Sequence, residues 1–205
     1  AMQTLAINGS RGDDFFDTTY GTVLKQYKGL EVLEGAEYGN YQAISKIMQA
    51  MHFQILVDTY GDVPYSEAFK GNNLTPKFDS ARQLHAQCIT LLDEGIAELR
   101  KTPTIAVVPA ADFMHGNTAA NVATWNSTNR IWWIRTAYAL KARLLQQLSK
   151  TGSYNANAVL SAVDSAYTNN TMEARVTIFT LRNPWATVAR NQAALVLDGW
   201  LSQHF

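Results

Sequence analysis

The sequence predicts an all-α fold built of irregular helical hairpins, with few or no strands. Three observations predict this class. Apolar residues recur at steps of three and four in several segments, as on the buried face of a helix. Glycine, asparagine and proline interrupt the pattern between these segments. No strong strand run competes with the helices, and no strict period of about 34 residues marks a regular repeat.

The first half of the chain predicts three helices. Asp13 and Asp14 suit a helix start, because carboxylates are favourable at the positive end of the helix dipole. The helix that follows them carries Phe16, Tyr20, Val23, Tyr27 and Leu30. A second helix ends at the corner of residues 61–64, and its apolar stripe is Tyr41, Ile44, Ile47, Met48, Met51 and Ile55. A capping box of Ser80 and Gln83 opens the third, with Leu84, Cys88, Leu91, Leu92, Ile96 and Leu99.

The second half is less regular. Residues 105–108 and 175–181 are expected to be extended, and residues 110–129 to form a long loop of the kind that is usually functional or mobile. A further helix is expected over residues 131–148. A shorter one begins at a cap, either Asn155 or Asn157, and a last apolar helix is expected over residues 188–201.

Composition bounds the class of protein. The 205 residues are 47% hydrophobic and 17% charged, enough for one globular helical domain over residues 1–205. Seventeen basic residues balance seventeen acidic ones, which argues against nucleic acid as a partner. The lone Cys88 and four scattered histidines predict no metal site, and no cofactor is expected. The chain is apolar to its last residue, which predicts a domain incomplete at the C-terminus.

The corner between the second and third helices is rich in acidic groups. Asp58, Asp62, Tyr65 and Glu67 invite an acid–base interpretation, since paired carboxylates hydrolyse glycosides. The structural interpretation is favoured, because side chains at a helix end usually bond to local backbone and Pro64 fixes the corner. The segment then affects function only through the surface that the hairpins present.

Five stretches together resemble the SusD/RagB family of surface lipoproteins. The corner reads Asp-Thr-Tyr-Gly-Asp-Val-Pro-Tyr over residues 58–65. Residues 46–51 look like the family's helix before the corner, and residues 75–80 and 91–99 like its next loop and helix. A later family helix is similar to the segment that holds Trp133, Arg135, Ala137, Leu140, Lys141 and Arg143. The chain is therefore identified as an N-terminal portion of such a protein.

The resemblance implies fold, function and partners together. It implies tetratricopeptide-like hairpins and a non-catalytic protein on the outer-membrane surface of Bacteroidetes-type bacteria. It implies capture of oligosaccharides, or of peptides in some members, for import through a SusC-like TonB-dependent transporter. Membrane attachment would come only from a lipid on a cysteine upstream of residue 1.

The candidate ligand-binding residues lie mostly in the predicted long loop. Trp125 offers a ring on which the apolar face of a sugar can stack, and Asn126 and Asn129 offer amides for its hydroxyls. Trp185 is a second, weaker candidate. The alternative is that Trp125 packs against the body of the domain. A binding role predicts an exposed aromatic cluster, and binding that weakens in Trp125→Ala without loss of folding.

Two other functions stay open. A helical-repeat scaffold for protein–protein interaction would show a concave polar groove that holds a protein tail. A glycoside hydrolase would need two carboxylates converging about 5 to 9.5 Å apart in a cleft. The sequence holds no nucleophile–base signature in a recognisable context.

Overall fold

The computed structural model describes residues 10–101, 109–115 and 119–176, and the chain divides into two units, residues 1–174 and 175–205. The α-helices are α1 (Ser10–Asp17), α2 (Lys25–Glu31), α3 (Gly39–Tyr60), α4 (Ala81–Leu99), α5 (Val122–Thr124), α6 (Arg130–Gln147) and α7 (Ala156–Asp164). The π-helices are η1 (Thr18–Leu24) and η5 (Trp125–Asn129), and the 3-10 turns are η2 (Ala36–Tyr38), η3 (Pro109–Ala111) and η6 (Asn170–Met172). Two short strands, β1 (Val63–Pro64) and β2 (Phe78–Asp79), pair antiparallel. The predicted all-α class is confirmed.

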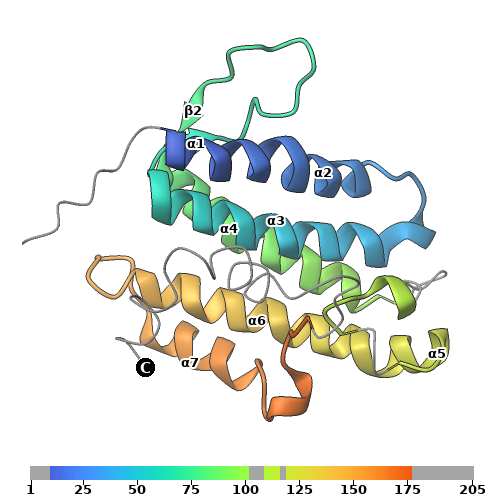
Figure 1. Ribbon diagram of the computed structural model, residues 1–205. Helices are drawn as coiled ribbons and strands as arrows, with labels where there is room; N and C mark the ends of the chain where they lie inside the picture. Colours follow the sequence, from blue (N-terminus) through green and yellow to red (C-terminus); the bar gives the residue numbers. More distant parts are fainter. Residues whose placement is uncertain (1–9, 102–108, 116–118, 177–205) are drawn as a thin grey trace, which may run out of the picture. The chain divides into compact units, whose positions relative to one another are not determined.

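The helices of the first unit pack on one another in chain order. Figure 1 shows α2 against α3, α3 against α4, α4 against α6 and α6 against α7, with successive helices running in opposite directions. The helical stretch α1–η1–α2 continues without a break along one side of α3. The helices thus form hairpins of unequal length, as the absence of a regular repeat in the sequence predicts.

The helix α3 is buried on most sides because it lies between α2 and α4. Ile47 is fully buried as expected, but Ile55 at the end of the predicted stripe is exposed. Several small and polar side chains of α3 are buried although they lie outside the predicted stripe: Ala43, Ser45, Gln49, Ala50 and Gln54. Apolar spacing therefore predicts this helix but not all of its buried faces, since a helix packed on two sides has no single apolar face.

The helices α3 and α4 approach closely at Gly95. A Cβ built there would lie 2.9 Å from Cγ1 of Ile47 and 3.0 Å from the carbonyl oxygen of Ala43. A side chain at residue 95 would therefore have to displace Ile47 or the backbone of Ala43. All six residues of the predicted α4 stripe are buried, which confirms the face that this helix turns inward.

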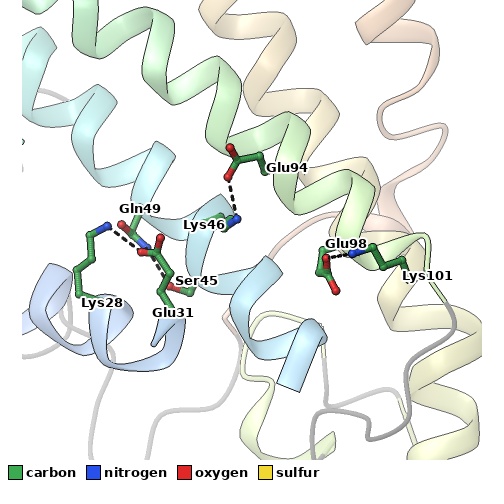
Figure 2. A network of polar contacts seen from close by, with 8 residues as sticks. All are labelled: Lys28, Glu31, Ser45, Lys46, Gln49, Glu94, Glu98 and Lys101. Atoms are coloured by element: carbon green, nitrogen blue, oxygen red, sulfur yellow. Dashed lines mark hydrogen bonds and ion pairs between the residues drawn. The ribbon is translucent and has the colours of Figure 1, made fainter. Parts of the chain in front are cut away.

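Polar contacts join α2, α3 and α4 beside this core (Figure 2). The buried Gln49 donates hydrogen bonds to Oε2 of Glu31 at 2.9 Å and to Oγ of Ser45 at 3.0 Å. Lys28 pairs with the same Glu31 oxygen at 2.8 Å. Burial raises the pKa of Glu31, but the hydrogen bonds from Lys28 and Gln49 lower it more, so this carboxylate stays charged.

The helix caps explain where the later elements begin. Oγ of Ser80 accepts a bond from the N–H of Gln83, as the capping box predicts, although the hydroxyl also donates to Oε1 of Gln83. Asn155 caps α7. Asn121 caps α5, so the predicted loop over residues 110–129 is wrong for its second part, which is helical from Val122 into α6.

Three predicted segments lie outside the described residues. They are residues 105–108 and most of 175–181, which were expected to be extended, and residues 188–201, which were expected to be helical. Within the described ranges, none of the helices combines the length and the apolar character that crossing a bilayer requires. The same ranges hold no group of three or more histidine, cysteine or acidic residues placed to bind a metal.

Candidate functional site

The corner after α3 is closed by glycine and by the small β1–β2 pairing. Gly61 has φ +79°, a left-handed conformation that ends the helix without a side-chain clash. Val63 and Pro64 then pair with Asp79 and Phe78. The loop between the two strands rises beyond α1 in Figure 1.

The carboxylates of the corner act on local backbone. Asp62 accepts a hydrogen bond from the N–H of Ala81 at 2.7 Å and so caps the start of α4. Glu67 accepts from Nδ2 of Asn73 and from the N–H of Lys77. These contacts support the structural interpretation of the two carboxylates, because each is occupied in holding a turn.

The nearby carboxylates of Asp79 and Asp58 also accept hydrogen bonds from other parts of the protein. Asp79 accepts bonds from the N–H groups of Tyr65 and Ser66, at 2.9 and 2.7 Å. Asp58 differs from the expectation that it bonds to local backbone: both of its oxygens accept from Nε2 of Gln147 on α6, at 3.2 Å. It therefore ties the end of α3 to a distant helix.

A row of aromatic rings crosses the corner from α1 to the β1–β2 loop. Adjacent ring centroids lie 6.3 Å apart for Phe15 and Tyr60, 5.4 Å for Tyr60 and Phe16, 4.5 Å for Phe16 and Tyr20, and 5.9 Å for Tyr20 and Phe69. We call these five residues the aromatic row. Three of its members reach solvent, including both ends: Phe15 is 42% exposed, and Tyr60 and Phe69 are each 36% exposed.

Tyr20 fixes the middle of the aromatic row. Its hydroxyl donates to the carbonyl oxygen of Pro64 at 2.6 Å, and its ring packs edge-on against the buried Phe53. Burial, and then the negative charge of Asp79, raise the pKa of this hydroxyl well above its usual value. The group therefore stays protonated, and the row is joined to the corner by a permanent donor.

Phe69 is held in a strained backbone conformation. It is the non-glycine residue with positive φ among those described, at +63°. A left-handed conformation costs a side chain about 1–2 kcal/mol, so the surrounding contacts must enforce it. Its ring stacks on Tyr20 at an interplanar angle of 26°. Such strain is often found at functional sites, and here it turns an aromatic ring toward the row.

Trp125 does not offer an exposed ring. Its side chain is 0% exposed, and its indole N–H donates to Oδ2 of Asp112 at 2.7 Å. Trp133 donates to the same oxygen at 2.9 Å. The structure thus shows the alternative in which Trp125 packs against the body, and we now expect Trp125→Ala to cost stability. That Trp125 stacks on a ligand stays a prediction, and its burial argues against it.

The two predicted amides lie in the same π-helical turn as Trp125. Asn129 is fully buried, and neither its Nδ2 nor its Oδ1 has a hydrogen-bond partner within the described ranges. The Oδ1 atom of Asn126 is likewise buried without a partner there. A buried amide without partners costs about 1–3 kcal/mol, which favours a bound water or ligand group at this turn. Trp185 lies outside the described residues.

A groove of about 920 Å³ borders the last turn of α3. Its walls combine apolar side chains from α3, α4 and the end of α6 with polar ones, namely Asp58, Arg82, His85 and Gln147. His85 is oriented by a hydrogen bond between Nε2 and the carbonyl oxygen of Leu144, at 3.1 Å. The groove and the aromatic row therefore both involve the last turn of α3.

Sequence patterns did not indicate the aromatic row. Phe15, Tyr60 and Phe69 come from three separate segments, so no single stretch of the sequence groups them. One signal was available, since Phe15 and Phe16 are adjacent and cannot both face the core of one helix. The strained φ of Phe69 had no sequence signal.

The fold and the row define a class of protein: stacked helical hairpins that present an aromatic surface at one corner. The chain belongs to the SusD-like family, whose sequence profile, described as starch-binding and associating with the outer membrane, matches residues 3–202. This confirms the resemblance to SusD/RagB proteins. None of the curated proteins matches the sequence.

Solved structures share the fold. A SusD/RagB family protein from Bacteroides thetaiotaomicron is 24% identical, with a TM-score of 0.70 over 87% of this chain and 37% of its own. A chitin-binding SusD homologue from Flavobacterium johnsoniae is 20% identical, with a TM-score of 0.74 over 91% of this chain and 38% of its own. A SusD homologue from Bacteroides uniformis is 22% identical, with a TM-score of 0.69 over 87% of this chain and 36% of its own. The chain thus spans less than two-fifths of the length of these structures.

Proposed function

We propose that the protein captures oligosaccharides at the bacterial surface and that the aromatic row is the part of this chain that contacts them. The observation that carries the proposal is the exposure of Phe15, Tyr60 and Phe69 along one row, in a member of a family described as starch-binding. Sugar rings have apolar C–H faces that pack on aromatic planes, so exposed rings suit this ligand.

Several rings are needed for useful affinity. One aromatic contact contributes about 1 kcal/mol beyond the area that it buries, which is less than a tenfold gain in binding. The row offers solvent-exposed rings at both of its ends, and the polar Lys70 and Asn72 follow Phe69 in the exposed loop. An extended ligand that touches both ends gains more than one such contact, which favours an oligosaccharide over a single sugar.

Membership of the SusD-like family suggests three further properties of the protein. We propose that the protein is not an enzyme, that a lipid upstream of residue 1 anchors it to the outer membrane, and that it delivers ligand to a SusC-like TonB-dependent transporter. The occupied carboxylates at Asp62 and Glu67 support the first of these. Incubation with oligosaccharides should release no new reducing ends, and co-expression with the transporter should yield a complex that co-purifies.

A peptide-binding scaffold is the second candidate, and the groove beside Asp58 favours it. A concave surface with apolar walls and charged groups suits an extended peptide. Binding of peptides but of no glycan, abolished by Arg82→Ala at the groove, would support this candidate and contradict the first.

Affinity electrophoresis in gels that contain amylose or chitin oligosaccharides tests the main proposal. Phe15→Ala should reduce the retardation of the full-length protein. Val32→Ala is the matched control, because Val32 is also apolar and exposed but lies about 25 Å along the same helical stretch. Equal retardation of wild type and Phe15→Ala would contradict a role for the row.

A further inference from the structure

A second cavity lies away from the aromatic row, between α2, α3 and the segment of residues 109–115. It is open to solvent on one side and has a volume of about 380 Å³, within the range of small-molecule sites. Four of its lining side chains are aromatic: Tyr27, Tyr41, Phe113 and Trp133. Met48 adds a polarizable sulfur to the same walls.

Asp112 is the charged residue among those that line this cavity. It is 5% exposed. Its Oδ1 accepts from the N–H of His115 at 2.9 Å, and its Oδ2 accepts from both Trp125 and Trp133. All three donors are neutral N–H groups, so they hold the carboxylate in place but do not cancel its charge.

Asp112 takes part in none of the ion pairs found within the described ranges, which involve other acidic residues. Burial lowers the pKa of His115 to about 4, against the opposing effect of Asp112, so at neutral pH this imidazole carries no charge. The wall of the cavity therefore carries a negative charge beside aromatic ring faces.

We propose that this cavity binds an organic ammonium ion, such as the amine of an amino sugar or of a lysine side chain. Aromatic faces attract cations through their quadrupole, and a cation within about 4–6 Å favours the charged form of a carboxyl group. A compact ammonium group with an apolar body satisfies both walls. Neither a neutral sugar nor an anion would complement the charge of Asp112.

The site is independent of the aromatic row, so its ligand need not be the captured oligosaccharide. The cavity involves α2, α3 and the residues around Asp112, whereas the row involves α1, the end of α3 and the β1–β2 loop. Loss of one activity without the other is therefore expected. Tyr60→Ala should leave ammonium binding unchanged.

NMR titration of the full-length protein tests the proposal. The indole N–H of Trp133 donates to Asp112 and its ring lines the cavity, so its resonance reports on the site. Trp133→Phe assigns the signal. Choline should shift it in a saturable manner, and 3,3-dimethylbutanol, the neutral isostere of choline, should not. Glucosamine and Nα-acetyl-lysine amide, which keeps a free side-chain amine, are then compared to distinguish the two sources of the ammonium group.

Two variants test whether Asp112 and the wall of the cavity bind the ammonium ion. Asp112→Asn should weaken choline binding at least tenfold. Since this variant also alters a buried network, Phe113→Ala, which changes an exposed wall residue, should weaken it several-fold in a protein that folds normally. An equal shift with the neutral isostere, or no saturable shift with any ammonium ion, would overturn the proposal.

Discussion

The carboxylate of Asp62 accepts a hydrogen bond from the N–H of Ala81 across nineteen residues of chain, at 2.7 Å. The corner that ends α3 thus caps the helix that follows the β1–β2 loop. Asp62→Ala should lower the free energy of unfolding by about 1 kcal/mol, as loss of a helix cap does. Asp62→Asn, whose amide oxygen still accepts, should lose less. Urea denaturation measures both, and equal losses would contradict the capping role.

Gly95 should resist substitution although it lies inside a helix. Alanine normally stabilises a helix by about 1 kcal/mol relative to glycine. At Gly95 the added methyl group meets Ile47 and the backbone of Ala43, and such overpacking costs about 1–3 kcal/mol. Gly29→Ala is the control, because a Cβ at that helical position meets nothing within 4 Å.

Thermal unfolding separates the two glycines. Gly95→Ala should lower Tm, and Gly29→Ala should leave it unchanged or raise it. A Tm for Gly95→Ala at or above that of Gly29→Ala would show that the helices separate there at little cost.

Cys88 should be inert in the native protein. It is fully buried, and burial, followed by the charge of Asp58, raises the pKa of its thiol to about 12. The reactive thiolate is therefore scarce at pH 8, and an alkylating reagent does not reach the buried sulfur. Iodoacetamide should label the protein only in denaturant. Complete labelling under native conditions would show that α4 opens readily.

The corner should weaken in acid through Asp79. Partial burial raises the pKa of this carboxyl, but the hydrogen bonds from Ser66 and Tyr65 lower it more, so the folded value lies below the usual 3.8. Its contribution to stability is then complete above pH 3.8 and is lost as the pH falls through the lowered folded value. Asp79→Asn should flatten this part of the stability curve, and an unchanged acid limb would contradict the assignment.

The sequence predicted the parts of the fold that depend on local chemistry. The α4 stripe, the cap at Ser80 and the glycine–proline corner follow from spacing and side-chain type. The buried face of α6 is not one that apolar residues mark: Ile131 is exposed and Ala137 is buried, because α6 contacts both α4 and α7. Helices packed on two sides lack the single apolar face that periodicity detects.

The candidate site was harder to predict for a related reason. Trp125 reads as a lone aromatic among polar residues, and its partner Asp112 lies thirteen residues earlier in a segment without periodicity. The aromatic row depends on contacts between α1, the end of α3 and the β1–β2 loop. Such contacts are fixed by tertiary packing, which no local pattern records.

A structure of the protein with a bound oligosaccharide tests the central claim most directly. The proposal predicts sugar rings in contact with Tyr60 and with at least one of Phe15 and Phe69. An oligosaccharide bound elsewhere, with these three side chains still exposed to solvent, would contradict it.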